Sequence, residues 1–212
     1  MSIVDKMVSF CIITDGRDPD LLRMELESIH SQNIPKYEII ICGNTINVAG
    51  LINSIIYFPE AAHEGRLGAM RNRACRQARG KILVVSDDDM RFESNWYKGL
   101  IEYGNNFDVL CGRLINPDGS RYWDWATHGG PHGHRLLRYD ETDDHIYVTG
   151  GLCVMKRYVF ENVQWDETRG FYQLEDVDFS RRVQQAGFTI KFNIHSTVVH
   201  LRPSWGSQEP GE

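Results

Sequence analysis

The stretch KILVVSDDD, residues 81–89, decides the fold of this 212-residue chain. Residues 81–86 form a nearly continuous apolar run, which is typical of a strand covered on both faces in a parallel sheet. The run leads directly into three aspartates. Ligands of open α/β sheets bind at the carboxyl ends of strands, so the stretch predicts a buried strand with a ligand site at its end.

Strands and helices alternate on the amino-terminal side of this stretch. Apolar runs at residues 7–14 and 37–42, and a weaker one at 52–58, predict strands. Helical spacing of apolar residues predicts helices over residues 18–30 and 67–80. This alternation predicts the α/β class, a mostly parallel central sheet with right-handed crossovers.

The second half of the chain is less regular. It contains a long polar and aromatic stretch, residues 116–145, which we interpret as a loop. The other elements expected there are helices over 94–103 and 174–185 and strands over 107–112, 146–155, 188–193 and 197–201. No internal repeat or linker divides the chain, so we expect one domain over residues 1–212.

Composition and charge limit the class of protein. Hydrophobic residues make up 42% and charged residues 25% of the chain, as in ordinary globular proteins. The net charge of -6 makes nucleic acid an unfavoured partner, although a local basic patch is compatible with that average. Five scattered cysteines, no signal peptide and no apolar run of about 20 residues predict a soluble cytoplasmic protein.

The three aspartates are the strongest chemical signal. Adjacent carboxylates on one turn repel each other unless a cation or hydrogen-bond donors neutralise them, which favours a divalent metal. Alternate side chains can serve different parts of one ligand, for example Asp87 a ribose hydroxyl and Asp89 a metal that holds phosphates. A solvated turn or a helix N-cap is the alternative.

Further candidate residues lie on both sides of the triplet. Glu175 and Asp176 begin a predicted helix, where one carboxylate could accept a proton or both could simply stabilise the helix dipole. His200 ends the last predicted strand and could reach a metal or serve a structural role. The spacing of His128, His132 and His134 suits a mobile loop better than a zinc site.

Basic residues precede the triplet. Arg66, Arg71 and Arg73 flank or lie on the helix before the 81–86 strand, where guanidinium groups and a helix N-terminus suit a pyrophosphate. Solvated surface charges are the alternative. Thr14 and Asp15 end the first predicted strand, at the same edge of the sheet as the aspartates.

The order and spacing of these segments resemble glycosyltransferase family 2 with the GT-A fold. The resemblance rests on FCIIT, EIIICGN, GRLGAMRNRACRQARGKILVVSDDD, WDETRGFYQLEDVDFSRRVQQAGF and the late histidine, and it covers most of residues 7–200. It implies a three-layer α/β/α sandwich, with residues 1–115 as the nucleotide-binding half and 116–212 as the half for acceptor and catalysis. It also implies Mn²⁺ or Mg²⁺ as the metal.

The resemblance also implies roles for individual residues. Asp87, Asp88 and Asp89 would bind the nucleotide-sugar and its metal, with Asp89 and possible help from His200 at the metal. Asp176 is the expected general base, in the motif that it forms with Glu175, and the transfer is expected to invert configuration. The remaining donor-side residues are Thr14, Asp15, Asn44, Arg66, Arg71 and Gly151.

One departure from the family pattern bears on the nucleotide. Family members commonly carry an acidic pair after the second strand, whereas this chain has Asn44 in Cys-Gly-Asn-Thr. Asn44 can hydrogen-bond a base edge, and UDP stays the favoured nucleotide. The hydroxyl acceptor is open, with Trp123, Trp125 and Trp205 as candidate stacking surfaces or, equally, core residues.

Two other functions compete with this interpretation. A sugar-phosphate nucleotidyltransferase would carry a glycine-rich, lysine-bearing loop after the first strand, where this chain has Thr-Asp-Gly-Arg-Asp at residues 14–18. A non-catalytic glycan- or protein-binding module on the same fold would not need Asp87, Asp89 and Asp176, which are all present. The sequence does not indicate an oligomeric state.

Overall fold

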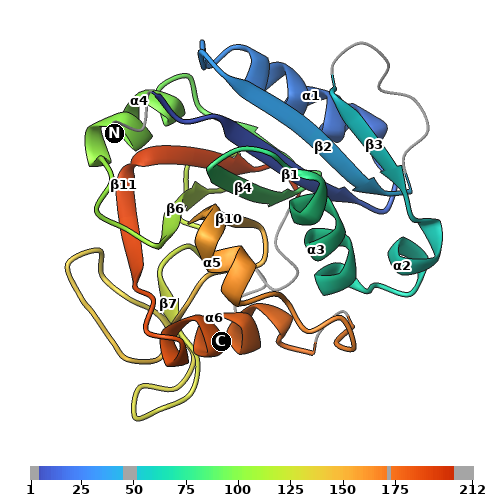
Figure 1. The fold of residues 1–212 in the computed structure, drawn as a ribbon. Helices are drawn as coiled ribbons and strands as arrows, with labels where there is room; N and C mark the ends of the chain where they lie inside the picture. The colour runs from blue at the N-terminus through green and yellow to red at the C-terminus, as the bar shows by residue number, and fades with distance from the viewer. Residues whose placement is uncertain (1–4, 45–51, 171–172, 203–212) are drawn as a thin grey trace.

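The computed structural model describes residues 5–44, 52–170 and 173–202. At its centre is an eight-stranded sheet in the order β3-β2-β1-β4-β10-β6-β11-β5 (Figure 1). The strands are β1 (Val8–Thr14), β2 (Tyr37–Gly43), β3 (Ser54–Tyr57), β4 (Ile82–Asp87), β5 (Met90–Phe92), β6 (Val109–Ile115), β10 (Leu152–Lys156) and β11 (Ile190–His200). The first four strands run parallel, as predicted from their apolar runs. β10 is antiparallel to β4 and β6, and β11 is parallel to β6 and antiparallel to β5.

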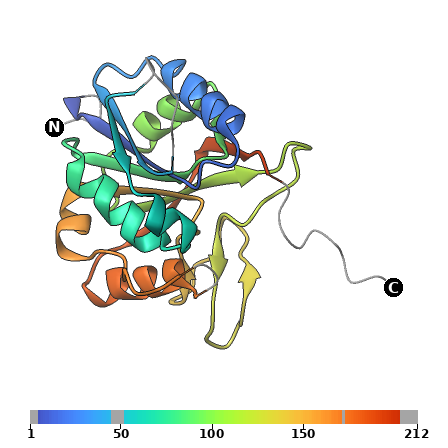
Figure 2. The ribbon, with the colours of Figure 1, turned by 90° about the vertical axis from the view of Figure 1, so that its right-hand side faces the viewer.

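Helices cover both faces of this sheet. One face carries α1 and α4, and the other carries α2, α3, α5 and α6 (Figures 1 and 2). The resulting three-layer α/β/α arrangement confirms the predicted fold class. The helices are α1 (Pro19–His30), α2 (Pro59–His63), α3 (Leu67–Gln77), α4 (Trp96–Tyr103), α5 (Arg157–Asn162) and α6 (Glu175–Gln185).

Strand β1 shows why the sheet needs both helical layers. Successive side chains of a strand point to opposite faces, and the strand is buried along its whole length. Phe10 and Ile12 belong to the core under α1 and α4, whereas Cys11 and Ile13 belong to the core under the other helices. An unbroken apolar run is therefore the pattern that a central strand of this sheet requires.

The structure departs from the prediction in its second half. The stretch 116–145, predicted as one loop, contributes two strands to a small three-stranded sheet of order β8-β7-β9. The predicted strand 146–155 divides into β9 and β10, and the predicted strands 188–193 and 197–201 join as β11 with a shift of register between Asn193 and Thr197. The small-sheet strands are β7 (Ala126–Thr127), β8 (Arg135–Leu136) and β9 (Ile146–Tyr147).

Two expectations about cysteines and membranes can be compared with the structure. All five cysteines are free and buried, as predicted. Within the described ranges, no helix combines the length and the apolar character that a membrane crossing requires.

The aromatic core under α1 and α4 makes a first prediction. Phe10 is fully buried and packs edge-on against Phe92. The ring centroids of Phe10 and Trp96 are 5.8 Å apart. Phe10→Ala should lower the free energy of unfolding by about 3–5 kcal/mol, because it removes buried contacts and leaves a cavity. Urea denaturation measures the change. Met24→Ala, at a side chain that is 40% exposed, is the control and should change stability little.

Candidate functional site

The carboxyl ends of β1 and β2 form one side of the site. The backbone N–H of Asn44 donates to the Thr14 carbonyl at 3.0 Å, and the Asn44 side-chain amide donates to the Asp15 carbonyl at 3.2 Å. A Cβ on Gly16, where φ is +81°, would lie 1.9 Å from the Asn44 carbonyl oxygen. Glycine is needed there, and it lets the two strand ends close on each other. Thr14, Asp15 and Asn44 are therefore brought together as predicted.

Arg71 joins the end of β4 to the start of α6. Its side chain is 1% exposed, and its guanidinium donates to Glu175 Oε1 at 2.9 Å, to Asp87 Oδ1 at 3.1 Å and to the Gly150 carbonyl at 3.0 Å. Burial lowers the pKa of this guanidinium, but the carboxylates of Asp87 and Glu175 outweigh burial and raise it. Arg71 is therefore a fixed cation that organises the site.

Asp88 and Asp89 are buried in spite of their charge. Each residue is 4% exposed. Burial raises the pKa of Asp88 to about 7. The Thr14 hydroxyl donates a hydrogen bond to Asp88 Oδ2, which lowers this pKa but does not outweigh burial. Burial and the charge of Asp87 raise the pKa of Asp89 to about 7. Asp89 Oδ1 has no hydrogen-bond partner among the described residues, so a buried acceptor is left for a ligand.

Pairing between β5 and β11 brings His200 to Asp89. In this antiparallel ladder His200 lies opposite Met90, the residue after Asp89, and the N–H of Leu201 donates to the Asp89 carbonyl at 2.8 Å. The result is a His200 Nε2 to Asp89 Oδ2 distance of 3.6 Å. That distance is too long for a hydrogen bond and leaves both atoms available to a third partner.

His200 is held in the form that binds metals. Its Nδ1 atom donates to the Arg202 carbonyl at 2.6 Å, which leaves the Nε2 lone pair on the side of Asp89. Burial lowers the pKa of the imidazole and so favours its neutral form. The ring also stacks on Tyr122, with 4.3 Å between centroids and 11° between planes. These contacts fix the orientation of His200.

Glu175 and Asp176 differ in what surrounds them. The Glu175 carboxylate forms an ion pair with Arg71. Among the described residues, the Asp176 carboxylate accepts hydrogen bonds from two backbone N–H groups, that of Val177 at 2.8 Å and that of Gly150 at 3.2 Å. Burial first, and then the charge of Glu175, raise the pKa of Asp176. Glu175 is thus held in an ion pair, whereas Asp176 has no side-chain partner among the described residues.

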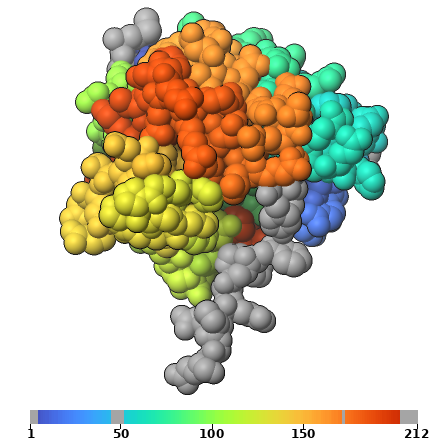
Figure 3. All heavy atoms as spheres, turned by 90° about the horizontal axis from the view of Figure 1, so that it is seen from below, coloured from blue at the N-terminus to red at the C-terminus, as the bar shows by residue number. Residues whose placement is uncertain are grey.

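The molecule has a hollow in its surface on the side of the C-terminal end of β11. Seen from below, the surface is recessed between α6 and the yellow-green segment that carries β7, and the dark red end of β11 lies at the bottom (Figure 3). A cavity of about 10 Å³ is lined by Arg71, Gly150, Asp176 and Trp165, among other residues. Asp176 thus lies at the same small cavity as the buried cation Arg71.

Comparison with known proteins identifies the family. The sequence model for Glycosyl transferase family 2 matches residues 9–164. The chain belongs to glycosyl transferase family 2. This confirms the resemblance drawn from the sequence motifs and places the chain among the glycosyltransferases. Glu175, Asp176 and His200 lie beyond the matched residues, so their assignment depends on their position in the fold. No curated protein sequence matches the chain.

Solved structures share the fold of this family 2 chain at low sequence identity. A structure of GalNAc-T7 with UDP, GalNAc and Mn²⁺ has a TM-score of 0.70 at 18% identity, covering 95% of this chain and 45% of GalNAc-T7. The mannosyltransferase PcManGT from Pyrobaculum calidifontis, in complex with GDP-Man and Mn²⁺, has a TM-score of 0.64 at 14% identity, with coverages of 95% and 58%. The structure of residues 1–349 of S. aureus TarS in complex with UDP has a TM-score of 0.61 at 14% identity, and the match covers 91% of this chain and 60% of TarS 1–349. The chain thus spans about half the length of these structures.

Some predicted site residues lie elsewhere in this family 2 structure. The tryptophan Trp125 is 3% exposed, packs against Phe192 and donates its indole N–H to the Glu141 carbonyl at 2.9 Å. It is a core residue, which is the second of the two alternatives that the sequence left open for it. Arg66 pairs with Glu64 at 2.6 Å, and within the described part of the chain it forms no ion pair with the aspartates.

Other predicted residues are placed near the site or outside the described chain. The Gly151 carbonyl accepts the N–H of Asp87 at 3.2 Å, so Gly151 lies beside the aspartates. Trp123 is half-buried and stacks on His134 at 4.5 Å. Trp205 lies outside the described residues. Across the described ranges, no three His, Cys, Asp or Glu side chains form a group that would hold a metal alone, the histidines of 128–134 included.

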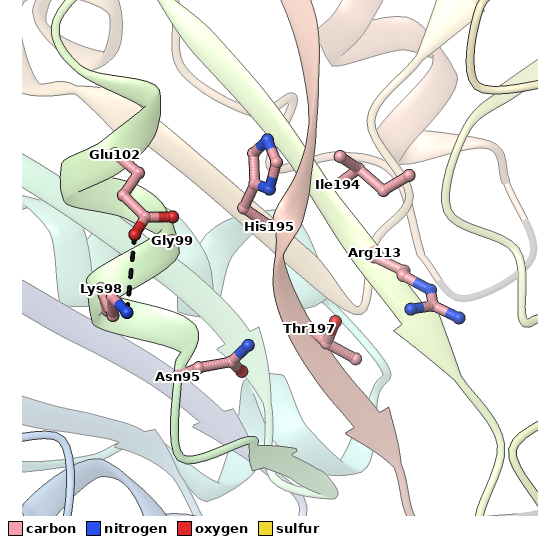
Figure 4. Close-up of a pocket in the computed structure, with 8 residues that line it drawn as sticks. All are labelled: Asn95, Lys98, Gly99, Glu102, Arg113, Ile194, His195 and Thr197. Atoms are coloured by element: carbon pink, nitrogen blue, oxygen red, sulfur yellow. Dashed lines mark ion pairs between the residues drawn. The ribbon is translucent and has the colours of Figure 1, made fainter.

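A larger pocket lies away from the aspartates. Its volume is about 240 Å³, and it lies where α4 packs against the irregular part of β11. In Figure 4 the Arg113 guanidinium points away from α4, whereas His195 lies between α4 and β11. The charged groups therefore do not converge on one point. The lining residues are Asn95, Lys98, Gly99, Glu102, Arg113, Ile194, His195 and Thr197.

Two residues of the site were missed in the sequence analysis. Tyr122 stacks on His200, and Arg202 places its guanidinium 3.5 Å from Asp88 Oδ1 and 3.7 Å from Asp89 Oδ2. Arg202 follows His200 by two residues on the chain, and an arginine so close to a predicted metal ligand could have been noted as a neutralising charge. Tyr122 had no sequence signal, because it lies in the stretch predicted as a loop.

The buried ion pair predicts a strong effect on stability. Arg71→Met should lower the free energy of unfolding by about 3–5 kcal/mol, because it leaves Glu175 buried without its cation. Arg71→Met with Glu175→Gln should recover part of this loss. Denaturation of the two single variants and the double variant gives the coupling energy. Arg76→Met, which breaks an exposed pair with Glu167, should cost at most about 1 kcal/mol.

The raised pKa values predict a pH dependence of stability. The folded protein keeps protons on Asp88 and Asp89 up to about pH 7, whereas the unfolded chain releases them near pH 4. The free energy of unfolding should therefore fall as the pH rises through this window. In a chelating buffer, Asp88→Asn should weaken this fall and be more stable than the wild type at pH 8. Asp140→Asn, at an exposed carboxylate, is the control, and equal pH profiles for D88N and the wild type would contradict the prediction.

Proposed function

We propose that the chain transfers a sugar from a nucleotide-sugar donor, most simply a UDP-sugar, to an acceptor hydroxyl with help from a divalent metal. The observation that carries the proposal is the pair formed by Asp89 and His200. Asp89 offers a buried oxygen without a partner, and His200 turns a neutral nitrogen toward the same carboxylate. Carboxylate and imidazole are both ligands of Mn²⁺. Two such groups on rigid strand ends suit a metal that also binds phosphate.

The donor set fits a metal that is shared with the substrate. Asp89 and His200 supply two ligands, and no further His, Cys, Asp or Glu completes a set of three within the described residues. Mg²⁺ commonly uses one or two protein carboxylates together with phosphate oxygens and water. Bound here, Mn²⁺ or Mg²⁺ would neutralise the diphosphate that leaves the sugar. This fit makes the diphosphate of the donor part of the metal site.

The strand ends on the other side suit the nucleoside. Thr14, Asp15 and Asn44 lie together at the ends of β1 and β2, with Asp88 hydrogen-bonded to Thr14. They offer hydroxyl, carboxylate and amide groups to a base and a ribose. GalNAc-T7 and TarS were solved with UDP and PcManGT with GDP-Man, which supports a nucleotide as the ligand of this chain. UDP is the nucleotide that we propose.

Asp176 is the proposed general base. It would take the proton from the acceptor hydroxyl as that oxygen attacks the anomeric carbon, with inversion of configuration. Its raised pKa makes it a better proton acceptor than an exposed aspartate. Glu175 holds Arg71 and so positions the start of α6, which makes it a positioning residue in this proposal. Trp123 and Trp205 stay candidates for the acceptor side.

A binding experiment tests the donor and the metal before an acceptor is known. Thermal stabilisation by UDP should require Mn²⁺ and should be lost in Asp89→Ala, because binding to the folded state raises its stability. The same measurement with GDP and dTDP tests the base. Metal-independent stabilisation by a nucleoside triphosphate would favour a nucleotidyltransferase. No stabilisation by any nucleotide would favour a non-catalytic module.

A second experiment tests the base. Asp176→Asn should retain Mn²⁺-dependent UDP binding but slow sugar transfer or donor hydrolysis by about 100-fold to 10,000-fold. Asp178→Asn is the matched control, because Asp178 lies on the same helix and pairs with Arg182 at 2.7 Å. Near-normal turnover by the Asp176 variant, with Asp89→Ala inactive, would remove Asp176 from the mechanism and favour retention of configuration.

A further inference from the structure

Arg202 approaches the aspartates from the end of β11. Its Nη2 atom lies 2.9 Å from Asp18 Oδ2, and its Nε atom donates to the same oxygen at 3.1 Å. Asp18 precedes the first turn of α1 and is half exposed. Arg202 itself is 27% exposed. The arginine is thus attached on one side by a single, partly solvated carboxylate.

On its other side Arg202 faces the proposed metal site. Its Nη2 atom is 3.5 Å from Asp88 Oδ1, and its Nη1 atom is 3.7 Å from Asp89 Oδ2. These distances give electrostatic attraction without the short contact of a hydrogen bond. Among the described residues, Arg202 is the only arginine or lysine within 4.0 Å of either carboxylate. It therefore supplies the charge that offsets two buried acids.

Arg202 and the proposed metal ligand His200 approach the same Asp89 oxygen. Asp89 Oδ2 lies 3.6 Å from His200 Nε2 and 3.7 Å from Arg202 Nη1. A metal ion and a guanidinium repel each other across such distances. A diphosphate changes the balance, since it carries enough negative charge to attract both cations, and a guanidinium binds phosphate oxygens well.

We propose that Arg202 is an internal counter-ion that makes metal binding depend on the diphosphate. This rests on the proposed function. Without a diphosphate, Arg202 opposes a metal ion on Asp89, so the metal binds weakly alone. With a diphosphate present, Arg202 pairs with phosphate oxygens, and both cations are stabilised. The metal and the nucleotide therefore bind with positive coupling, and Arg202 is the positioning residue that produces it.

A purely structural role makes a different prediction. If Arg202 only fastened the end of β11 to α1 through Asp18, its loss would affect stability and leave metal affinity unchanged. An exposed pair of this kind contributes little to stability. Asp18→Asn removes this attachment without removing the guanidinium. It should leave the coupling between metal and nucleotide largely intact if the counter-ion role is correct.

The experiment measures Mn²⁺ binding directly by electron paramagnetic resonance, with and without UDP. Arg202→Gln should bind Mn²⁺ alone about 3-fold to 10-fold more tightly than the wild type, because a repelling charge is gone. It should bind Mn²⁺ more weakly than the wild type when UDP is present. Arg202→Lys keeps the charge and should bind Mn²⁺ alone like the wild type. Arg138→Gln is the matched control, since it removes an arginine that pairs with exposed Asp140.

The outcomes separate this inference from the proposed function. Weaker or unchanged binding of Mn²⁺ alone by folded Arg202→Gln overturns the counter-ion role, even when the wild type binds Mn²⁺ and UDP together. The same change in Arg138→Gln would make the effect one of net charge and would also overturn it. A wild type that binds neither Mn²⁺ nor UDP overturns the proposed function and the inference with it. Circular dichroism confirms that each variant is folded.

Discussion

The candidate site depends on one buried cation, Arg71. Its guanidinium contacts Asp87 at the end of β4, the Gly150 carbonyl before β10 and Glu175 at the start of α6, three segments that are far apart in the sequence. A buried charge is costly unless it is paired and hydrogen-bonded, so the interaction is stable only when all three segments are in place. Formation of the fold and assembly of the site are for this reason one event. The same constraint fixes Asp176, because it follows Glu175 on the helix that Arg71 holds.

The acidic side of the site is organised differently. Asp88 and Asp89 are buried with too few donors, and their raised pKa values show that their charged forms are poorly stabilised by the protein alone. Proteins commonly keep such unfavourable groups where a ligand compensates for them. Arg71 neutralises Asp87 permanently, whereas Arg202 lies at 3.5 Å and 3.7 Å from Asp88 and Asp89 and is partly solvated. The site therefore has a fixed part around the buried Arg71 and an adjustable part around the partly solvated Arg202.

Much of this arrangement could be predicted from the sequence, for identifiable reasons. The strands β1, β2 and β4 are buried on both faces, so their apolar runs are continuous and their polar ends stand out, which located Thr14 and the three aspartates. Short elements gave no such signal: β7, β8 and β9 have two residues each, and periodicity cannot be read from two residues. The sequence left two roles open for Trp125, because a tryptophan in a polar stretch looks the same whether its ring is exposed or packed on Phe192. Arg202 was missed because its role depends on distances between side chains, which spacing along the chain does not give.

The position of His200 shows how a weak element can decide a functional contact. β5 has only three residues, and no pattern in the sequence predicted it. Its pairing with β11 nevertheless sets His200 opposite Met90 and so beside Asp89. A slip of one residue would turn every side chain of the paired segment to the other face and would move the imidazole away from the carboxylate. The shift of register between Asn193 and Thr197 lies between the part of β11 that pairs with the start of β6 and the part that reaches β5. Because of this irregularity, β11 can pair with both β6 and β5 and still place His200 beside Asp89. The geometry of the proposed metal site therefore depends on the pairing of strands in the central sheet.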